Sequence, residues 1–132
     1  MAGSAAGGGG GEYNPEDPRT NPFAGQAPWC SVGAEVVVAA TQEVAKVVGG
    51  DGSFAQVQLK LGGALKSLRP SELQPVAPAK HHVARAFAGD YNGKQGTMDG
   101  VDGEDGILKV MVYGETDFAI VQMCDVVKVA EW

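Results

Sequence analysis

The chain has 132 residues, a formal net charge of −6 and twenty glycines. This length is enough for one ordinary domain or for two very small ones. No apolar run is close to the length of a membrane span, which is about 20 residues. The segment from Met1 to Ser4 lacks the basic region and apolar core of a signal peptide. We therefore expect a small protein with no membrane partner.

The charges are spread unevenly along the chain. Residues 1–28 carry one basic and three acidic side chains, residues 29–78 carry four of each, and residues 79–132 carry five and nine. A domain that holds nucleic acid by itself normally has a basic face. The charge distribution therefore favours protein partners, with RNA or DNA as a weak and secondary contact.

Residues 1–28 have the composition of a linker. They contain seven glycines and four prolines, which oppose both helix and sheet. We expect a disordered Gly/Pro-rich tail here and place the first domain boundary at residue 29.

Residues 29–78 have the pattern of a small β unit. β-branched residues dominate its opening stretch, three glycines between 49 and 52 fit a tight hairpin, and residues 54–59 alternate as in a half-buried strand. The proline at position 70 fits the start of a single helical turn. The expected strands are 35–40, 45–48, 54–59, 64–68 and 74–76, with the helical turn at 70–73.

Residues 79–132 repeat this order of elements. The expected strands are 83–87, one that begins near 95–98, 107–112, 118–121 and 126–129. Residues 88–93 form a longer loop than their counterpart in the first unit, and residues 102–106 form the hairpin turn. Trp132 is a candidate lid at the end of the second unit.

The two halves align at a spacing of 53 residues. Residues 50–57 match 103–110, and residues 71–76 match 124–129. A repeated unit this small has no room for a deep catalytic cleft. We therefore expect an all-β protein of two tandem five-stranded barrels that binds partners and is not an enzyme.

Motifs for catalysis or cofactor binding are incomplete in this sequence. Gly89 to Gln95 resembles a phosphate loop, but three residues separate its glycines where four are required, and Gln95 replaces the hydroxyl residue. The acidic stretch 99–106 lacks the ligand register of a calcium loop. Adjacent His81 and His82 point to opposite faces if they lie on a strand. We expect no catalytic residues, no metal, no cofactor and no small-molecule substrate.

The two cysteines, Cys30 and Cys124, belong to no CxxC pair. We expect reduced thiols, with a bridge between the two copies as the alternative.

Three stretches of the sequence resemble a known family. Residues 85–98, a strand followed by a glycine loop and a second strand, resemble a KOW motif. Residues 70–80 and 101–110 are similar to the last interdomain junction and the final hairpin turn in the C-terminal tandem KOW region of the large subunit of DSIF, the eukaryotic NusG-type elongation factor. Tyr13-Asn14-Pro15 is similar to the low-complexity repeats before those domains.

The resemblance spans about residues 29–132 and carries several expectations. It implies two SH3-like KOW barrels, a nuclear location, and docking to proteins of the RNA polymerase II elongation complex. The NusG domain of that family is missing from this sequence, so we expect either a fragment of a longer factor or a short paralogue. The tail has no Thr-Pro or Ser-Pro pair, so kinase control of the repeats is not carried over.

Candidate contact residues lie mainly on loops. Arg85 and Lys94 flank the glycine loop that contains Gly93, the region where the resemblance implies RNA or protein contacts. A possible basic strip on the first unit consists of Lys46, Lys60, Lys66 and Arg69, of which Lys46 and Lys60 lie on neighbouring expected strands. The alternative is that these cations are ordinary solvated side chains.

Two other functions stay open at this point. One is a ribosome-associated or other RNA-binding KOW protein. The other is a Tudor-like peptide reader, in which Tyr91, Tyr113 and Phe118 form an aromatic cage for methylated lysine.

Overall fold

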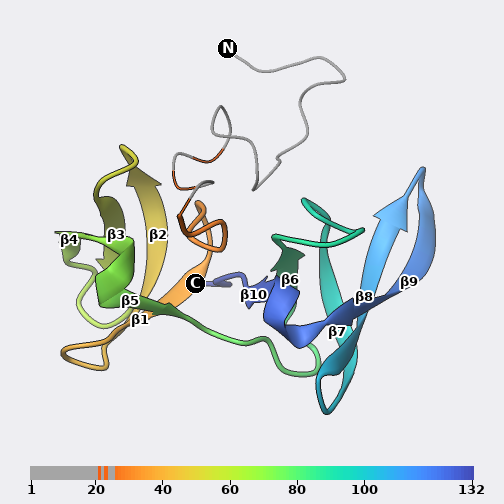
Figure 1. The fold of residues 1–132 in the computed structure, drawn as a ribbon. Coiled ribbons are helices and arrows are strands. Elements are labelled where there is room, and N and C mark those ends of the chain that lie inside the picture. Colours follow the sequence, from red (N-terminus) through yellow and green to blue (C-terminus); the bar gives the residue numbers. More distant parts are fainter. Residues whose placement is uncertain (1–20, 22, 24–25) are drawn as a thin grey trace.

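The computed structural model describes residues 21, 23 and 26–132, and over this range the chain forms two five-stranded antiparallel sheets (Figure 1). The strand orders are β4-β3-β2-β1-β5 and β10-β6-β7-β8-β9. The elements of the first unit are β1 (Glu35–Val38), β2 (Val44–Gly50), β3 (Ala55–Leu59), β4 (Leu65–Leu68), η2 (Pro70–Glu72) and β5 (Leu73–Pro75). The elements of the second unit are β6 (Val83–Ala86), β7 (Gln95–Asp102), β8 (Asp105–Val112), β9 (Glu115–Gln122), η3 (Met123–Asp125) and β10 (Val126–Lys128).

The predicted fold class is confirmed: the protein is all-β, with two small barrel-like units in tandem. The two strand orders are the same once each element is matched with its partner in the other unit. The single helical turn predicted to start at Pro70 is present as η2, and its equivalent η3 lies before the last strand. Within the described residues, no helix has the length and apolar character needed to cross a membrane.

Most of the predicted tail, residues 1–20, 22 and 24–25, lies outside the described residues. The described residues just before position 29 differ from the expectation of a tail. Phe23 is 1% exposed and lies in the first core together with Ala27. The Asn21 side chain accepts a hydrogen bond from the Phe23 N–H and donates one to the Pro28 carbonyl, both at 3.0 Å. The packed part of the first unit therefore begins before residue 29.

The structure corrects the alignment of the repeat in the central hairpins. A β-bulge between Val47 and Gly49 matches one between Met98 and Gly100, so the spacing there is 51 residues. The spacing of 53 holds from η2 and β5 to η3 and β10. The change in spacing from 51 to 53 residues arises in the next hairpin. Between equivalent paired residues, the β8–β9 hairpin contains two more residues than the β3–β4 hairpin. The sequence alignment had matched the two glycine-acid turns because their compositions are similar. This match placed the turns two residues out of structural register.

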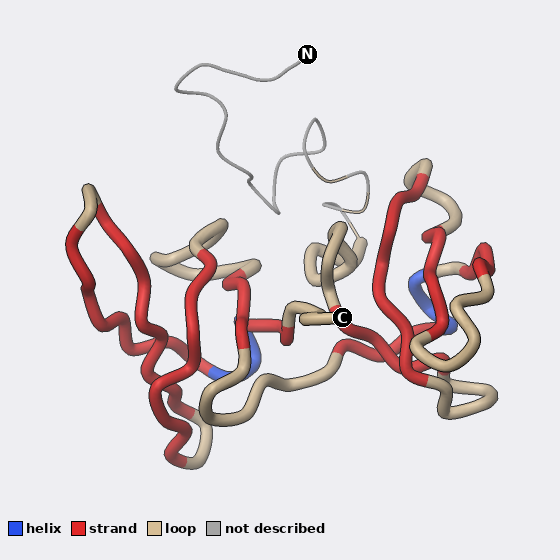
Figure 2. Tube along the Cα trace, turned by 180° about the vertical axis from the view of Figure 1, so that it is seen from behind, coloured by secondary structure: helices blue, strands red, loops and turns tan. Residues whose placement is uncertain are grey.

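Each unit has its own cluster of buried apolar side chains, and the units also contact one another. Val127 of β10 lies in the first core, and Phe87 packs against that core. Ala34 and Val129 form an isolated antiparallel bridge. The Lys128 and Ala130 amides donate to carbonyls of the first unit at 2.8 Å. Figure 2 shows the two groups of strands side by side, with the C-terminus between them.

A buried ion pair reinforces this junction. The Lys128 ammonium lies 3.0 Å from the Glu35 carboxylate, with side-chain exposures of 17% and 7%. The Trp132 indole also donates to Glu35, at 3.2 Å. The predicted lid residue therefore lies between the two units rather than over the second barrel alone.

Candidate interaction surface

Arg85, a candidate contact residue, binds across the junction between the units. From β6, its Nη1 donates to the Ser31 hydroxyl and to the Val32 carbonyl, each at 2.8 Å. Its Nε and Nη2 donate to the Gln95 side chain at 3.1 and 2.9 Å. These bonds give the guanidinium a structural role in holding the first unit against the second.

Lys46, a second candidate, also lies at the junction. Its ammonium contacts the backbone carbonyl of Trp132 and lies 4.8 Å from the centroid of the Trp132 ring. The cation–π geometry and the carbonyl contact both orient Lys46 toward the C-terminus.

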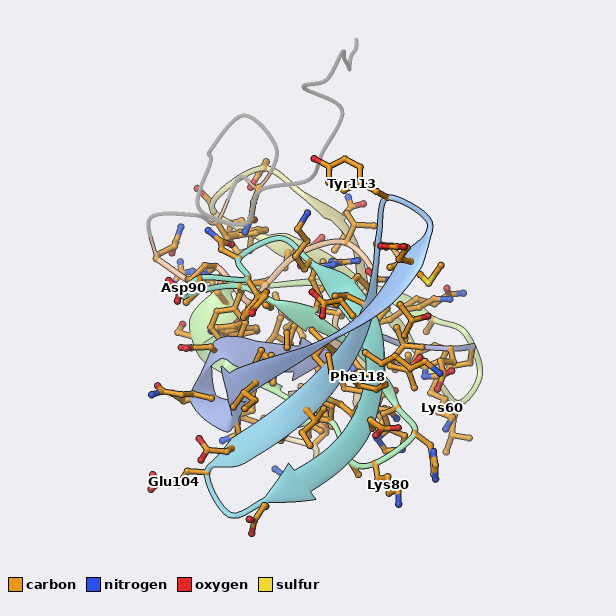
Figure 3. All side chains as sticks on the ribbon, turned by 90° about the vertical axis from the view of Figure 1, so that its right-hand side faces the viewer. Lys60, Lys80, Asp90, Glu104, Tyr113 and Phe118 are labelled. Carbon is orange, nitrogen blue, oxygen red and sulfur yellow. The ribbon has the colours of Figure 1, made fainter. Side chains whose placement is uncertain are left out.

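The other three candidates lie elsewhere. Gly93 has a φ of +89° and donates from its amide to Ala86, so glycine is required by this turn. The Lys94 side chain is exposed beside it in the second unit. Lys60 is exposed just after β3 in the first unit (Figure 3). The five candidates are thus divided between the junction and two separate loops.

The histidines and the acidic side chains were the residues considered for metal binding. No group of three or more His, Cys, Asp or Glu side chains in the described part of the chain is close enough to hold a metal ion. The His82 Nδ1 accepts a hydrogen bond from the Ala79 amide at 2.9 Å. Both histidines lie in the connection between β5 and β6, outside any strand.

Exposed apolar side chains gather on the outer side of β8 and β9 in the second unit, beside the end of β7. We call this surface the β7–β9 face. It consists of Ile107, Met111, Phe118 and Ile120, which are 41–74% exposed, and Gly100 of β7 borders it as the partner of Ile107. Ile107 and Ile120 are direct partners in the β8–β9 ladder, so their side chains lie next to each other on the outer side of the sheet.

Two hollows border the β7–β9 face, and Ile120 lines both. The turn-side hollow, of about 350 Å³, is also lined by Val101, Ile107, Asp102 and Asp105. The loop-side hollow, of about 360 Å³, is also lined by Tyr91, Asp90 and Asp125. Neither hollow has a lysine or arginine among its lining residues.

The first unit provides an internal comparison for this surface. At the structural spacings given above, Gln56 is equivalent to Ile107, and Ser67 is equivalent to Ile120. Gln56 and Ser67 line the matching hollow of the first unit, which has a volume of about 220 Å³. The same fold therefore forms with polar residues at both positions, so the isoleucines are not needed to build the barrel.

The first unit also exposes apolar side chains near this position. Phe54 is 41% exposed and lines the same hollow as Gln56 and Ser67. Leu61 and Leu65 are 87% and 70% exposed near the turn between β3 and β4, and Leu65 is equivalent to Phe118 of the second unit. The contrast between the units is therefore confined to the Ile107 and Ile120 positions.

The three aromatic residues considered for a methyl-lysine cage occupy different environments. Tyr91 is partly buried and packs against the second core. Tyr113 is fully exposed at the tip of the β8–β9 hairpin, whereas Phe118 lies part-way along β9 (Figure 3). This arrangement does not resemble one cage.

Sequence reasoning missed Ile107 and Ile120, although a signal was present. Residues 118–121 are apolar without interruption, and residues 107–112 are apolar apart from Lys109. A sheet in so small a unit buries one face, so continuous apolar strands must also present apolar side chains outward.

No family model matches the chain, and no match was found among curated proteins.

Proposed function

We propose that this chain is a non-catalytic tandem KOW module that docks proteins of the RNA polymerase II elongation machinery in the nucleus. The observation that carries the proposal is the pair of barrels with matched strand order, joined directly, of which the second has an exposed apolar face. The resemblance of residues 70–80 and 101–110 to the DSIF large subunit supplies the link to transcription.

The charge distribution supports protein docking over RNA binding as the main activity. Arg85 and Lys46 contact the other unit, and the second unit carries nine acidic against five basic residues. Phosphate groups bind through lysine and arginine, and the β7–β9 face has carboxylates around it. RNA or DNA is therefore an accessory contact in this proposal, centred on Lys94 and Lys60.

The test is purification of the tagged full-length gene product from crosslinked chromatin. We expect transcribing RNA polymerase II to co-purify, and we expect its recovery to survive nuclease treatment because the contact is between proteins. Absence of polymerase from the chromatin fraction would remove the elongation role. Recovery mainly with ribosomes, lost after ribonuclease treatment, would favour the RNA-binding alternative instead.

A further inference from the structure

We propose that the β7–β9 face binds a basic segment of a partner protein, with an aliphatic side chain of that segment seated against Ile107 and Ile120. This inference rests on the proposed docking function and specifies the chemistry of the partner. It concerns a surface that none of the five sequence-predicted contact residues occupies.

The apolar part of the proposed site, Ile107 and Ile120, has no apolar counterpart at the equivalent positions of the first unit. Ile107 and Ile120 are 41% and 74% exposed. The first unit has polar residues, glutamine and serine, at the equivalent positions, so the fold does not require isoleucine there. Exposed aliphatic side chains gain free energy when a partner removes them from water. A contiguous apolar surface with a polar rim is typical of protein interaction sites.

The rim of the β7–β9 face is acidic and therefore favours a positively charged partner. Residues 95–122 contain six carboxylates and one lysine. Two aspartates line each hollow, Asp102 and Asp105 in the turn-side hollow and Asp90 and Asp125 in the loop-side hollow. Lysine or arginine side chains on both sides of the aliphatic anchor would match this arrangement.

The same charges disfavour the other occupants. A second copy of this chain placed face to face would bring the acidic rims together, and like charges in contact oppose association. The chain's own residues 1–28 carry one basic and three acidic side chains, so they lack the required positive charge. Nucleic acid is disfavoured by the carboxylates.

The inference is tested by titrating the ¹⁵N-labelled full chain with a short peptide whose paired central leucines are flanked by lysines on both sides. We expect the amide resonances of Val101, Ile107 and Ile120 to shift. In the double variant I107Q/I120S the affinity should fall about tenfold or more, the result of losing about 1.4 kcal/mol or more of apolar contact. The two substitutions copy the residues of the first unit, so the barrel is expected to fold.

Two controls separate specific docking from general attraction. Leu65→Ser removes an equally exposed side chain from the first unit and should leave the affinity unchanged. Asp102→Asn with Asp105→Asn keeps the apolar surface and should weaken binding, with less dependence on salt than the natural protein. A peptide with glutamate in place of lysine should not bind.

Several outcomes would overturn the inference. These are unchanged affinity in I107Q/I120S, an equal loss in Leu65→Ser, equal binding of the glutamate peptide, or resonance shifts confined to the first unit. A natural chain that is dimeric by sedimentation and becomes monomeric in I107Q/I120S would assign the face to a second copy. If polymerase fails to co-purify while the lysine peptide still binds here, the elongation role fails and this site stands.

Discussion

The two cysteines differ sharply in their surroundings. Cys30 is fully buried in the first core, and burial raises the pKa of its thiol from 9.0 to about 12. Cys124 is exposed on η3 of the second unit. Both are free thiols in the structure, which agrees with the expectation of reduced cysteines and not with a bridge between the copies.

We predict that only one of these thiols reacts in the native protein. The thiolate is the reactive form, so exposed Cys124 should be labelled by Ellman's reagent at pH 8 while Cys30 should not. In urea both should react. Labelling that persists in Cys124→Ser without denaturant, at the rate of an exposed thiol, would contradict the burial of Cys30.

The raised pKa of Cys30 also sets the sign of a pH effect on stability. The unfolded thiol loses its proton near pH 9, whereas the folded thiol keeps it until about pH 12. The contribution of the neutral thiol is therefore fully present below pH 9 and declines as the pH rises toward 12. Urea midpoints measured between pH 7 and pH 10 should fall over this window in the natural chain and in Cys124→Ser alike.

At the scale of elements, the close contact between β7 and β8 explains why position 96 is a glycine. A Cβ atom added at Gly96 would lie 2.0 Å from the Lys109 carbonyl oxygen, which belongs to the backbone of β8. Gly100 lies on the same strand and has no heavy atom within 4 Å of the equivalent position. The first unit has Ala45 at the position equivalent to Gly96, so this close approach is particular to the second unit.

We therefore predict opposite effects for alanine at these two positions. Gly96→Ala should lower the free energy of unfolding by about 1–3 kcal/mol, because the backbone of β8 must move. Gly100→Ala should be neutral or slightly stabilising, since alanine reduces the entropy of the unfolded chain. Urea unfolding of both variants measures the difference, and equal stability of the two would show that the strands are not in such close contact.

The sequence was informative about elements because their signals are local. Pro70 indicated the short helical turn, and glycines near 49–52 and 102–106 indicated the two hairpins, as β2–β3 and β7–β8 now confirm. The alternation of residues 54–59 matches the buried and exposed positions of β3. Such patterns depend on backbone conformation and on burial within one strand, which neighbouring residues largely determine.

The candidate site was harder to predict because it depends on distant residues. Arg85 was expected to contact a partner, but its hydrogen-bond acceptors include Ser31, 54 positions away. Nothing in the sequence indicated which face of β8 and β9 would remain uncovered. A charged side chain therefore looked functional, while the exposed isoleucines looked like core.

At the scale of the whole molecule, each unit is small enough to need its neighbour. A domain of about 50 residues buries too little surface to be more than marginally stable. Here Val127 fills part of the first core, while β10 and the segment after it donate backbone hydrogen bonds to the first unit. We infer that the two units unfold together and present their surfaces in a fixed relation.

The buried ion pair at the junction tests this inference. Glu35 is 6% exposed, accepts from Lys128 at 3.0 Å and also accepts from the Trp132 indole. Removing the carboxylate leaves the Lys128 charge with little access to water, a change that typically costs about 3 kcal/mol or more. We predict that Glu35→Ala destabilises the chain by this amount and separates its single urea transition into two. Circular dichroism and the fluorescence of Trp29 and Trp132 would measure the transitions.

The matched control for this variant is an ion pair on the surface. Glu43 and Lys66 lie 3.4 Å apart with both side chains 42% exposed, so solvent weakens their attraction. Glu43→Ala should therefore change stability little and should keep a single transition. If Glu35→Ala behaves in the same way, the ion pair does not couple the units, and each barrel must then be stable through its own core.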